Sequence, residues 1–248
     1  MKRLFGGDAP VDAHGFRLRG REVSRLEALS DAVFGFAITL LVVSLEVPRS
    51  YDELMTMMTG FVSFGICFAM LLMVWYTHFT FFVRYGLHDF TTVILNSILL
   101  FVVVFYIYPL KFMFTLMVAG FLGIGRTPDM DFSMTGDQAV TLMLLYSLSI
   151  VVVFSVFCAM FVHAWRRREA LGLDALERHI TVTSIRYCAI WMLVGLLSMA
   201  LAGFGGPRMV AFAGMSFALL GPLQGFNGWL RSRSAPAREE GERELAAA

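Results

Sequence analysis

Asp31 is an acidic residue at the beginning of an apolar stretch that continues to Pro48. From residue 32 to residue 45, the only polar side chains in this stretch are the hydroxyls of Thr39 and Ser44. With its flanks, the stretch is long enough to cross a bilayer as one helix, because a span needs roughly 20 largely apolar residues. A carboxylate just inside such a span is costly, so Asp31 marks a candidate functional site.

The helical periodicity of this stretch separates an apolar row from the acidic residue. At about 100° per residue, the following residues share one face, called the seam below: Leu29, Val33, Phe36, Leu40, Val43 and Val47, with Thr39 at its edge. Asp31 lies roughly 140° from Phe36 by the same arithmetic. If several subunits bring this helix to a common axis, the middle of the seam and Thr39 would surround that axis. Such a seam is otherwise ordinary helix packing, and the Thr39 hydroxyl can simply bond the Gly35 carbonyl.

Polar residues of three apolar stretches are predicted to meet at one depth. Counting inward from the cytoplasmic ends of three antiparallel spans gives the members of this network: Arg25, Ser30, Asp31, His78 and Asn96, with Trp75 one turn away. A buried carboxylate needs such partners, since an unpaired charge in an apolar interior is costly. One interpretation is a network that locks the first helix to the second and third. The other is a gate or proton sensor in which His78 titrates near neutral pH. Packing is preferred because Asp31 points away from the seam.

The composition of the chain indicates whether it folds in water or in a lipid bilayer. Apolar residues make up 58% of the sequence and charged residues only 16%, whereas a soluble domain carries about 25% charged residues. The formal net charge of +1 argues against a nucleic-acid partner. The sequence therefore predicts an integral protein of the cell membrane, with the lipid bilayer as its partner.

The chain order predicts an all-α fold, an integral membrane six-helix bundle. Residues 1–24 are expected to form a solvated cytoplasmic arm, residues 25–230 the six-span domain, and residues 231–248 a disordered cytoplasmic tail. The six spans are expected at about 28–48, 53–83, 90–117, 139–165, 181–201 and 209–229. Basic residues concentrate in the arm and in the loops on its side, which predicts that both termini are cytoplasmic.

Other candidate residues fall inside the later apolar stretches. Cys67, Cys158 and Cys188 show no metal-ligand spacing, so free buried thiols and no metal site are expected. Arg186 and Tyr187 are expected at the beginning of the fifth span, where their side chains reach toward water or join the polar network.

The opening of the first apolar helix resembles the transmembrane protein 175 family of potassium channels. The resemblance rests on Arg25-x-x-x-Leu29-Ser30-Asp31, followed within two turns by Ala-Ile-Thr-Leu-Leu at 37–41, and continues more weakly at Trp75, His78 and Asn96. Leu29 stands where the family usually has Phe, and Phe36 where it usually has Ile or Leu.

The resemblance implies a homotetramer with a central pore lined by the first helix. It implies an apolar constriction at Phe36, Leu40 and Val43, a ring of hydroxyls from Thr39, and passive conduction of potassium and other monovalent cations. Apolar constrictions gate by dewetting, so no carbonyl filter is required. The motif around Asp31 is implied to support helix packing near the cytoplasmic side.

The sequence contains none of the common enzyme signatures. It lacks a glycine-rich phosphate loop, His-Glu-x-x-His and Gly-x-Ser-x-Gly, so neither an enzyme nor a cofactor is expected. Thr-Val-Gly-Tyr-Gly is missing as well, which excludes a conventional potassium filter. Two alternatives stay open: a proton-coupled secondary transporter that uses Asp31 and His78, and a non-conducting membrane assembly protein.

Overall fold

All the long secondary-structure elements in the described part of the chain are helices. The computed structural model describes residues 10–20, 22–43, 49–122 and 134–234, and it contains no β-strand over these ranges. The prediction of an all-α fold is therefore confirmed. The helices are α1 (Arg25–Val43), α2 (Tyr51–Tyr85), α3 (Phe90–Leu122), α4 (Gly136–Arg166), α5 (Ala175–Gly205), α6 (Val210–Met215) and α7 (Leu220–Ser234), with short 3-10 turns at Gly206–Met209 and Ser216–Leu219.

Three of these helices begin with the same local hydrogen-bond pattern. At α1, the Ser24 hydroxyl accepts a hydrogen bond from the Glu27 amide at 3.2 Å, while the Glu27 carboxylate accepts one from the Ser24 amide at 3.2 Å. Thr135 begins α4 and Asp174 begins α5 in the same reciprocal way. Each pair satisfies amides that the first helical turn leaves without partners, so these beginnings follow from the local sequence.

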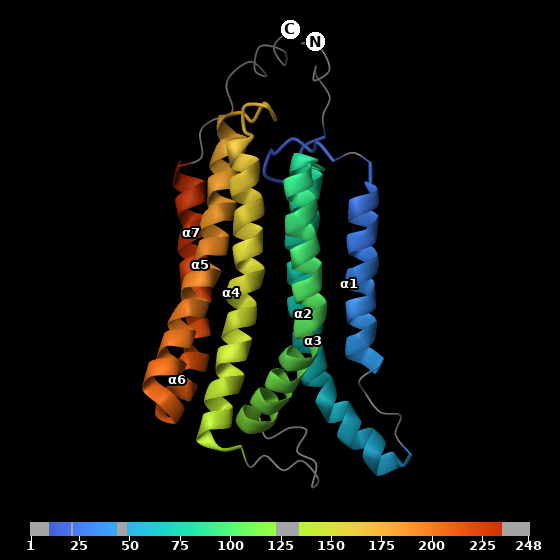
Figure 1. Cartoon of the computed structure of the whole chain (residues 1–248), viewed down its shortest axis with the longest axis vertical. Coiled ribbons are helices and arrows are strands. Elements are labelled where there is room, and N and C mark those ends of the chain that lie inside the picture. The colour runs from blue at the N-terminus through green and yellow to red at the C-terminus, as the bar shows by residue number, and fades with distance from the viewer. Residues whose placement is uncertain (1–9, 21, 44–48, 123–133, 235–248) are drawn as a thin grey trace.

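The long helices run side by side in two groups (Figure 1). Among the described elements, α1 contacts only α2 and α3, while α5 lies between α4 and α7. Contacts between α3 and α4 join the two groups. The α4–α5 interface is the most extensive, because Gly195 lets the two backbones approach: a Cβ built there would lie 2.7 Å from Val151 Cγ2. The first helix is therefore supported from one side only.

Four stretches of the described chain are long and apolar enough to cross a membrane. They are Gly60–Tyr85, Phe90–Val118, Gly136–Arg166 and Ala175–Arg233. The last stretch doubles back, since α5 and α7 lie against each other (Figure 1). These stretches make the chain a multi-pass membrane protein. The predicted sixth helix at 209–229 differs from the structure, because the 3-10 turn at Ser216–Leu219 divides this segment into α6 and α7.

Residues 10–20 fold onto one end of the bundle, which is called the arm end below (Figure 1). Phe16 is fully buried, and its ring meets the Tyr85 ring edge to face at 5.3 Å. The amides of Arg19 and Gly20 donate to the Val83 carbonyl at 3.0 Å. The prediction of a solvated arm is therefore wrong for residues 10–20, because an aromatic side chain and two backbone hydrogen bonds hold them against α2.

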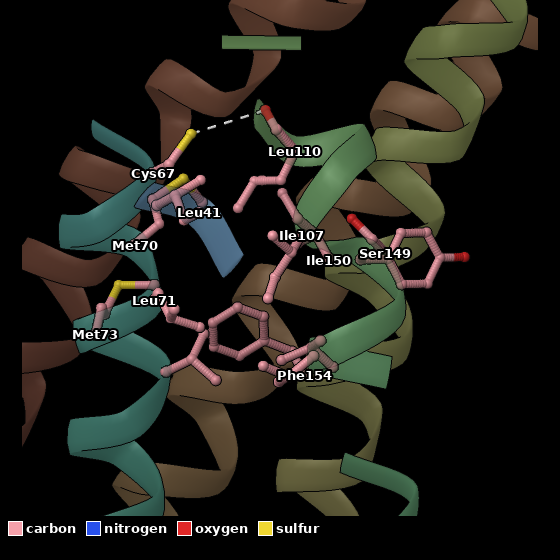
Figure 2. A pocket seen from close by; sticks show the side chains of 14 residues that line it. Leu41, Cys67, Met70, Leu71, Met73, Ile107, Leu110, Ser149, Ile150 and Phe154 are labelled. Carbon is pink, nitrogen blue, oxygen red and sulfur yellow. Dashed lines mark hydrogen bonds between the residues drawn. The ribbon is translucent and has the colours of Figure 1, made fainter. Parts of the chain in front are cut away.

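An apolar cavity of about 70 Å³ lies where the two groups of helices meet. Figure 2 shows Leu41 of α1, Leu71 of α2, Ile107 of α3 and Phe154 of α4 around it. Pro109 lies inside α3 close to this level, and a proline in a helix interior removes a backbone hydrogen bond and favours a bend. The described bundle is thus loosely packed directly behind the C-terminal half of α1.

Candidate functional site

One face of α1 is buried and the opposite face is exposed in the single chain. The buried row follows helical spacing and consists of Glu27, Ser30, Phe34, Ala37 and Leu41. This row meets α2 and α3, the two neighbours of α1 among the described elements. A helix of a packed bundle usually places its apolar residues toward the core, yet α1 also carries large apolar residues on its outer side.

The predicted seam lies on this outer side. Leu29 is 57% exposed and Phe36 is 56% exposed, while Thr39 is exposed and Leu40 half-buried. The Thr39 hydroxyl donates to the Gly35 carbonyl at 2.9 Å. This is the hydrogen bond within the helix that the sequence analysis gave as the alternative to a pore role. The side chain of Val43 and residues 44–48, including Val47, lie outside the described part. Val33 of the seam is partly buried against the core, whereas Phe36 and Thr39 are largely uncovered in the single chain.

Three of the predicted polar residues form one buried chain of hydrogen bonds, called the polar triad below. The Asn96 amide donates to the Ser30 hydroxyl at 2.8 Å, and the Asn96 carbonyl oxygen lies 2.8 Å from His78 Nε2. Ser30 in turn donates to the Leu26 carbonyl at 2.8 Å. All three side chains are at most 1% exposed. The triad therefore joins α1, α2 and α3 by polar contacts inside an apolar core.

Asp31 and Trp75 form a separate pair outside the triad. Trp75 Nε1 donates to Asp31 Oδ1 at 2.8 Å, and Asp31 is exposed in the single chain. The predicted burial of Asp31 is not seen in the single chain, because Trp75 contacts its carboxylate while the rest of the residue stays exposed. Arg25 is exposed and forms no hydrogen bond or ion pair with any described residue.

The polar triad is separate from the Asp31–Trp75 pair, which bears on the alternative of a proton-coupled transporter. The hydrogen bonds of His78 lead through Asn96 and Ser30 to the backbone carbonyl of Leu26 and end there. None of the described hydrogen bonds connects this chain to Asp31. A proton relay between His78 and Asp31 thus lacks a continuous path in the described residues, whereas helix packing needs only the contacts seen.

Comparisons with known proteins agree on one family. The sequence profile described as "Endosomal/lysosomal potassium channel TMEM175" matches residues 25–106, from α1 into α3. A protein of Marivirga tractuosa named "Potassium channel" is 34% identical over 242 residues, which cover 95% of this chain and 98% of that protein. The chain belongs to the TMEM175 family of potassium channels.

Two solved structures of TMEM175 proteins share the fold. The crystal structure of the potassium channel MtTMEM175, a threonine-to-alanine variant bound to a nanobody–MBP fusion, is 33% identical with a TM-score of 0.78. The match covers 88% of this chain and 97% of that one. A lysosomal potassium-selective TMEM175 homologue from Chamaesiphon minutus, at 23% identity and a TM-score of 0.55, covers 82% and 96% and supports the fold.

The matched region of the TMEM175 profile contains the residues predicted for the pore and the polar residues predicted to meet near Asp31. The seam, the polar triad and the Asp31–Trp75 pair all lie between residues 25 and 106. The second group of helices, α4 to α7, lies outside this region. The candidate site of this TMEM175 protein is thus built by α1 and the two helices that support it.

Sequence reasoning missed an ion-pair cluster at the arm end of this TMEM175 protein. Glu177 is fully buried, and its carboxylate accepts from Arg17 Nε at 3.0 Å and from Arg19 Nη2 at 2.6 Å. The Arg17 amide also donates to Glu177 at 3.0 Å. The only local signal was the pattern Asp174-x-x-Glu177 at the beginning of α5, which predicts a helix start but gives no indication of the arginines.

Asp12 ties the same arm to the end of α2. Arg84 Nη2 donates to Asp12 Oδ2 at 2.7 Å, and the Phe16 amide donates to Asp12 Oδ1 at 2.9 Å. Burial raises the pKa of Asp12, but the Phe16 amide and the Arg84 guanidinium outweigh that effect and hold the pKa below its usual value of 3.8. The arm is therefore held by contacts that need an ionised carboxylate.

Asp89 makes a comparable junction in front of α3. It lies 2.7 Å from His163 Nε2 and 3.0 Å from Arg167 Nη2, both at the arm end of α4. Burial raises the pKa of Asp89, while hydrogen bonds from Thr92 and His163 lower it, with a net shift below the usual value. The arm end thus holds the two groups of helices together through charged contacts.

Proposed function

We propose that this chain assembles as a homotetrameric channel that conducts potassium and other monovalent cations through a pore lined by α1. Membership of the TMEM175 family supports this function, and the Marivirga relative and MtTMEM175 are themselves named potassium channels. Conduction of this kind is passive, so the proposal needs no cofactor, and potassium is the permeant species.

The observation that carries the proposal is the uncovered outer side of α1. Phe36 is 56% exposed next to the exposed hydroxyl of Thr39, and α1 contacts only α2 and α3 in the described chain. Most homo-oligomers close around a symmetry axis. Four copies that place this side at a common axis would remove the seam from lipid and give Thr39 an aqueous neighbour.

The chemistry of these side chains suits a narrow pore. In the proposed pore, Phe36, Leu40 and Val43 form rings of apolar atoms that exclude water when the pore is narrow, so that small changes in diameter control wetting. Thr39 donates its hydroxyl hydrogen to the Gly35 carbonyl. The oxygen lone pairs of Thr39 would then face the axis, where they can replace a water ligand of a passing cation.

The proposed topology has six spans and cytoplasmic ends. The spans are α1 to α5 and, as the sixth, the segment from α6 to α7. Arginines at the arm end, among them Arg84, Arg167 and Arg231, outnumber those at the opposite end in the described chain. Since loops rich in arginine and lysine stay on the cytoplasmic side, the arm end is assigned to the cytoplasm.

Flux through purified protein in liposomes tests the proposal. With a potassium gradient and a potassium-selective ionophore as the reference, the protein should release potassium passively, and sodium in the same assay gives the selectivity. Potassium flux that requires a proton gradient would indicate the transporter alternative instead. No cation flux from protein that elutes as a folded oligomer would indicate a non-conducting assembly.

A further inference from the structure

The apolar cavity lined by α1, α2, α3 and α4 lies at mid-depth of the membrane-spanning helices (Figure 2). Apart from Leu41 of α1, its lining residues lie within 67–74 of α2, 103–110 of α3 and 149–154 of α4. Each segment falls near the middle of a stretch that can cross a membrane, namely Gly60–Tyr85, Phe90–Val118 and Gly136–Arg166. The cavity is therefore at the level of the hydrocarbon core of the bilayer.

This cavity offers few hydrogen-bond partners to a water molecule. The Ser149 hydroxyl in its wall donates to the Tyr146 carbonyl at 2.6 Å, and the Cys67 thiol lies 3.9 Å from the Leu110 carbonyl. The other lining side chains are apolar, apart from Tyr106. A buried water typically makes about three hydrogen bonds, whereas an apolar cavity stays dry and accepts apolar guests such as xenon or benzene.

Aromatic contacts hold the α4 side of the cavity wall in place. The Phe154 ring stacks on the Trp191 ring of α5, with ring centres 4.5 Å apart and planes at 1°. Phe154 also meets the Tyr187 ring edge to face at 6.1 Å. Tyr187 lies well inside α5, which begins at Ala175, and not at the beginning of the span where the sequence analysis placed it. Closing the cavity by moving Phe154 would break both ring contacts.

The cavity is partly open, which gives a guest a way in. Met70 and Met73 of α2 and Tyr106 of α3 are half-buried lining residues, whereas Leu71 and Ile107 are buried. The half-buried residues mark the side on which the cavity opens. Methionine is unbranched and adapts to irregular neighbours, so an apolar molecule of the bilayer core can pass these side chains.

We propose that this cavity binds a small apolar guest from the bilayer core, either a dissolved molecule or the methyl end of a lipid acyl chain. At about 70 Å³, the cavity exceeds the share of one water, about 30 Å³, and is smaller than an engineered cavity of about 150 Å³ that takes benzene. The guest is therefore only a few non-hydrogen atoms in size. Its dispersion contacts supply the neighbours that the lining side chains lack.

The guest lies directly behind the proposed pore helix. Leu41 of α1 lines the cavity, and it lies about 160° from Thr39 on the helical wheel. If α1 lines the pore, a movement of this helix away from the pore axis pushes Leu41 into the cavity. A bound guest then opposes widening of the pore at Thr39. This effect rests on the proposed function, whereas the binding site itself does not.

Xenon-pressurised crystals of the full-length protein test the binding site, because the anomalous signal of xenon shows its position directly. The filled variant, Val103→Ile/Val153→Ile, adds one methyl group at each of two lining residues and should exclude xenon. The control, Val102→Ile/Val156→Ile, makes the same change at buried valines of α3 and α4 that do not line the cavity. Control and wild-type protein should both hold xenon.

Two further measurements complete this test. Unpressurised wild-type crystals identify the source of the guest, since elongated density in the cavity indicates an acyl chain and its absence a dissolved molecule. The filled variant should melt no lower than the control, because its methyl groups enter empty space and not a packed core. A wild-type cavity with neither xenon nor a chain, or with ordered water, would overturn the proposal. A filled variant that still binds xenon, or melts below the control, would do the same.

Potassium flux in liposomes measures the effect on α1. The filled variant should conduct several-fold less than wild type, because the added methyl groups take the place of the guest, while the control should conduct like wild type. Unchanged flux in a filled variant that excludes xenon would reject the effect on α1. No flux from any of the three proteins would reject the proposed function instead, and the xenon result would still decide whether the binding site exists.

Discussion

Asn96 of α3 donates a hydrogen bond to the Ser30 hydroxyl of α1 at 2.8 Å, with both side chains fully excluded from solvent. Asn96 also contacts His78 of α2. One amide side chain therefore satisfies polar groups from two of the helices next to its own. Because the contact is buried in an apolar layer, it fixes the rotation of α1 more strictly than apolar packing alone could.

The Asn96 contact predicts a large loss of stability on its removal. Asn96→Leu should lower the free energy of unfolding by about 2–4 kcal/mol, because His78 and Ser30 then lose a partner and each unsatisfied group costs about 1–3 kcal/mol. Thermal unfolding of the purified protein measures the effect. Ser97→Ala is the control, because it changes an exposed side chain one residue further along α3. Equal melting temperatures of Asn96→Leu and Ser97→Ala would show that the triad does not hold α1.

The exposed ring of Phe36 predicts an effect on conduction. Phe36→Ala should increase cation flux in liposomes several-fold, because a smaller side chain widens an apolar constriction and eases its wetting. Phe101→Ala is the matched control, since Phe101 is 70% exposed on α3 and lies outside the seam. Unchanged flux in Phe36→Ala would remove this residue from the proposed pore.

Accessibility along α1 distinguishes the pore side from the side of Asp31. A cysteine at Thr39 should make conduction sensitive to a water-soluble thiol reagent, whereas a cysteine at Val42, about 20° from Asp31 on the helical wheel, should not. Cys67 and Cys188 are buried free thiols, but Cys158 is only half-buried, contrary to the prediction of three buried thiols. The background is therefore Cys158→Ala. Block of the Val42 variant without block of the Thr39 variant would place the Asp31 side of α1, and not the seam, at the axis.

The Asp31–Trp75 hydrogen bond predicts a small effect of removing the charge. Asp31→Asn keeps an oxygen that Trp75 Nε1 can donate to, so the loss of stability should be at most about 1 kcal/mol, the size of a typical net hydrogen bond. Trp75→Phe removes the donor, and the double variant shows whether the two effects share one contact. A variant of unchanged stability but altered ion selectivity would assign Asp31 to the conduction path instead.

Acid should release the arm from the bundle. An aspartate whose folded-state pKa lies below its usual value of 3.8 stabilises the folded arm above that pH and loses this contribution as the pH falls through the folded-state pKa. Hydrogen exchange of residues 10–20, corrected for the intrinsic rate at each pH, should therefore accelerate below pH 3.8. In Asp12→Asn, exchange should be faster at neutral pH and change less with acid. A wild-type arm that stays equally protected across this range would contradict the assignment.

Local sequence signals predicted the helices well because their causes are local. The apolar length of each helix and the seam on α1 depend on neighbours within a few residues. The capping pattern at Ser24 and Glu27, which the structure showed, is equally local. The break at Ser216–Leu219 was not predicted, since a largely apolar segment of this length favours a continuous helix.

The contacts of the arm depended on the tertiary structure. Arg17 and Glu177 are 160 residues apart, and nothing near either residue indicates its partner. Phe16 stands between Gly15 and Arg17 in the sequence, and Tyr85 at the end of α2 helps to bury it. Such pairs are determined by chain topology, which periodicity does not encode.

The sequence by itself determined the membrane class, the all-α fold, the family and the two faces of α1, because composition and helical spacing need no neighbour. Only the tertiary structure decided which face meets α2 and α3, and therefore that Ser30 is buried while Asp31, the next residue, is exposed. Helical spacing fixes the angle between two side chains, but the side chains packed around a helix decide the environment of each.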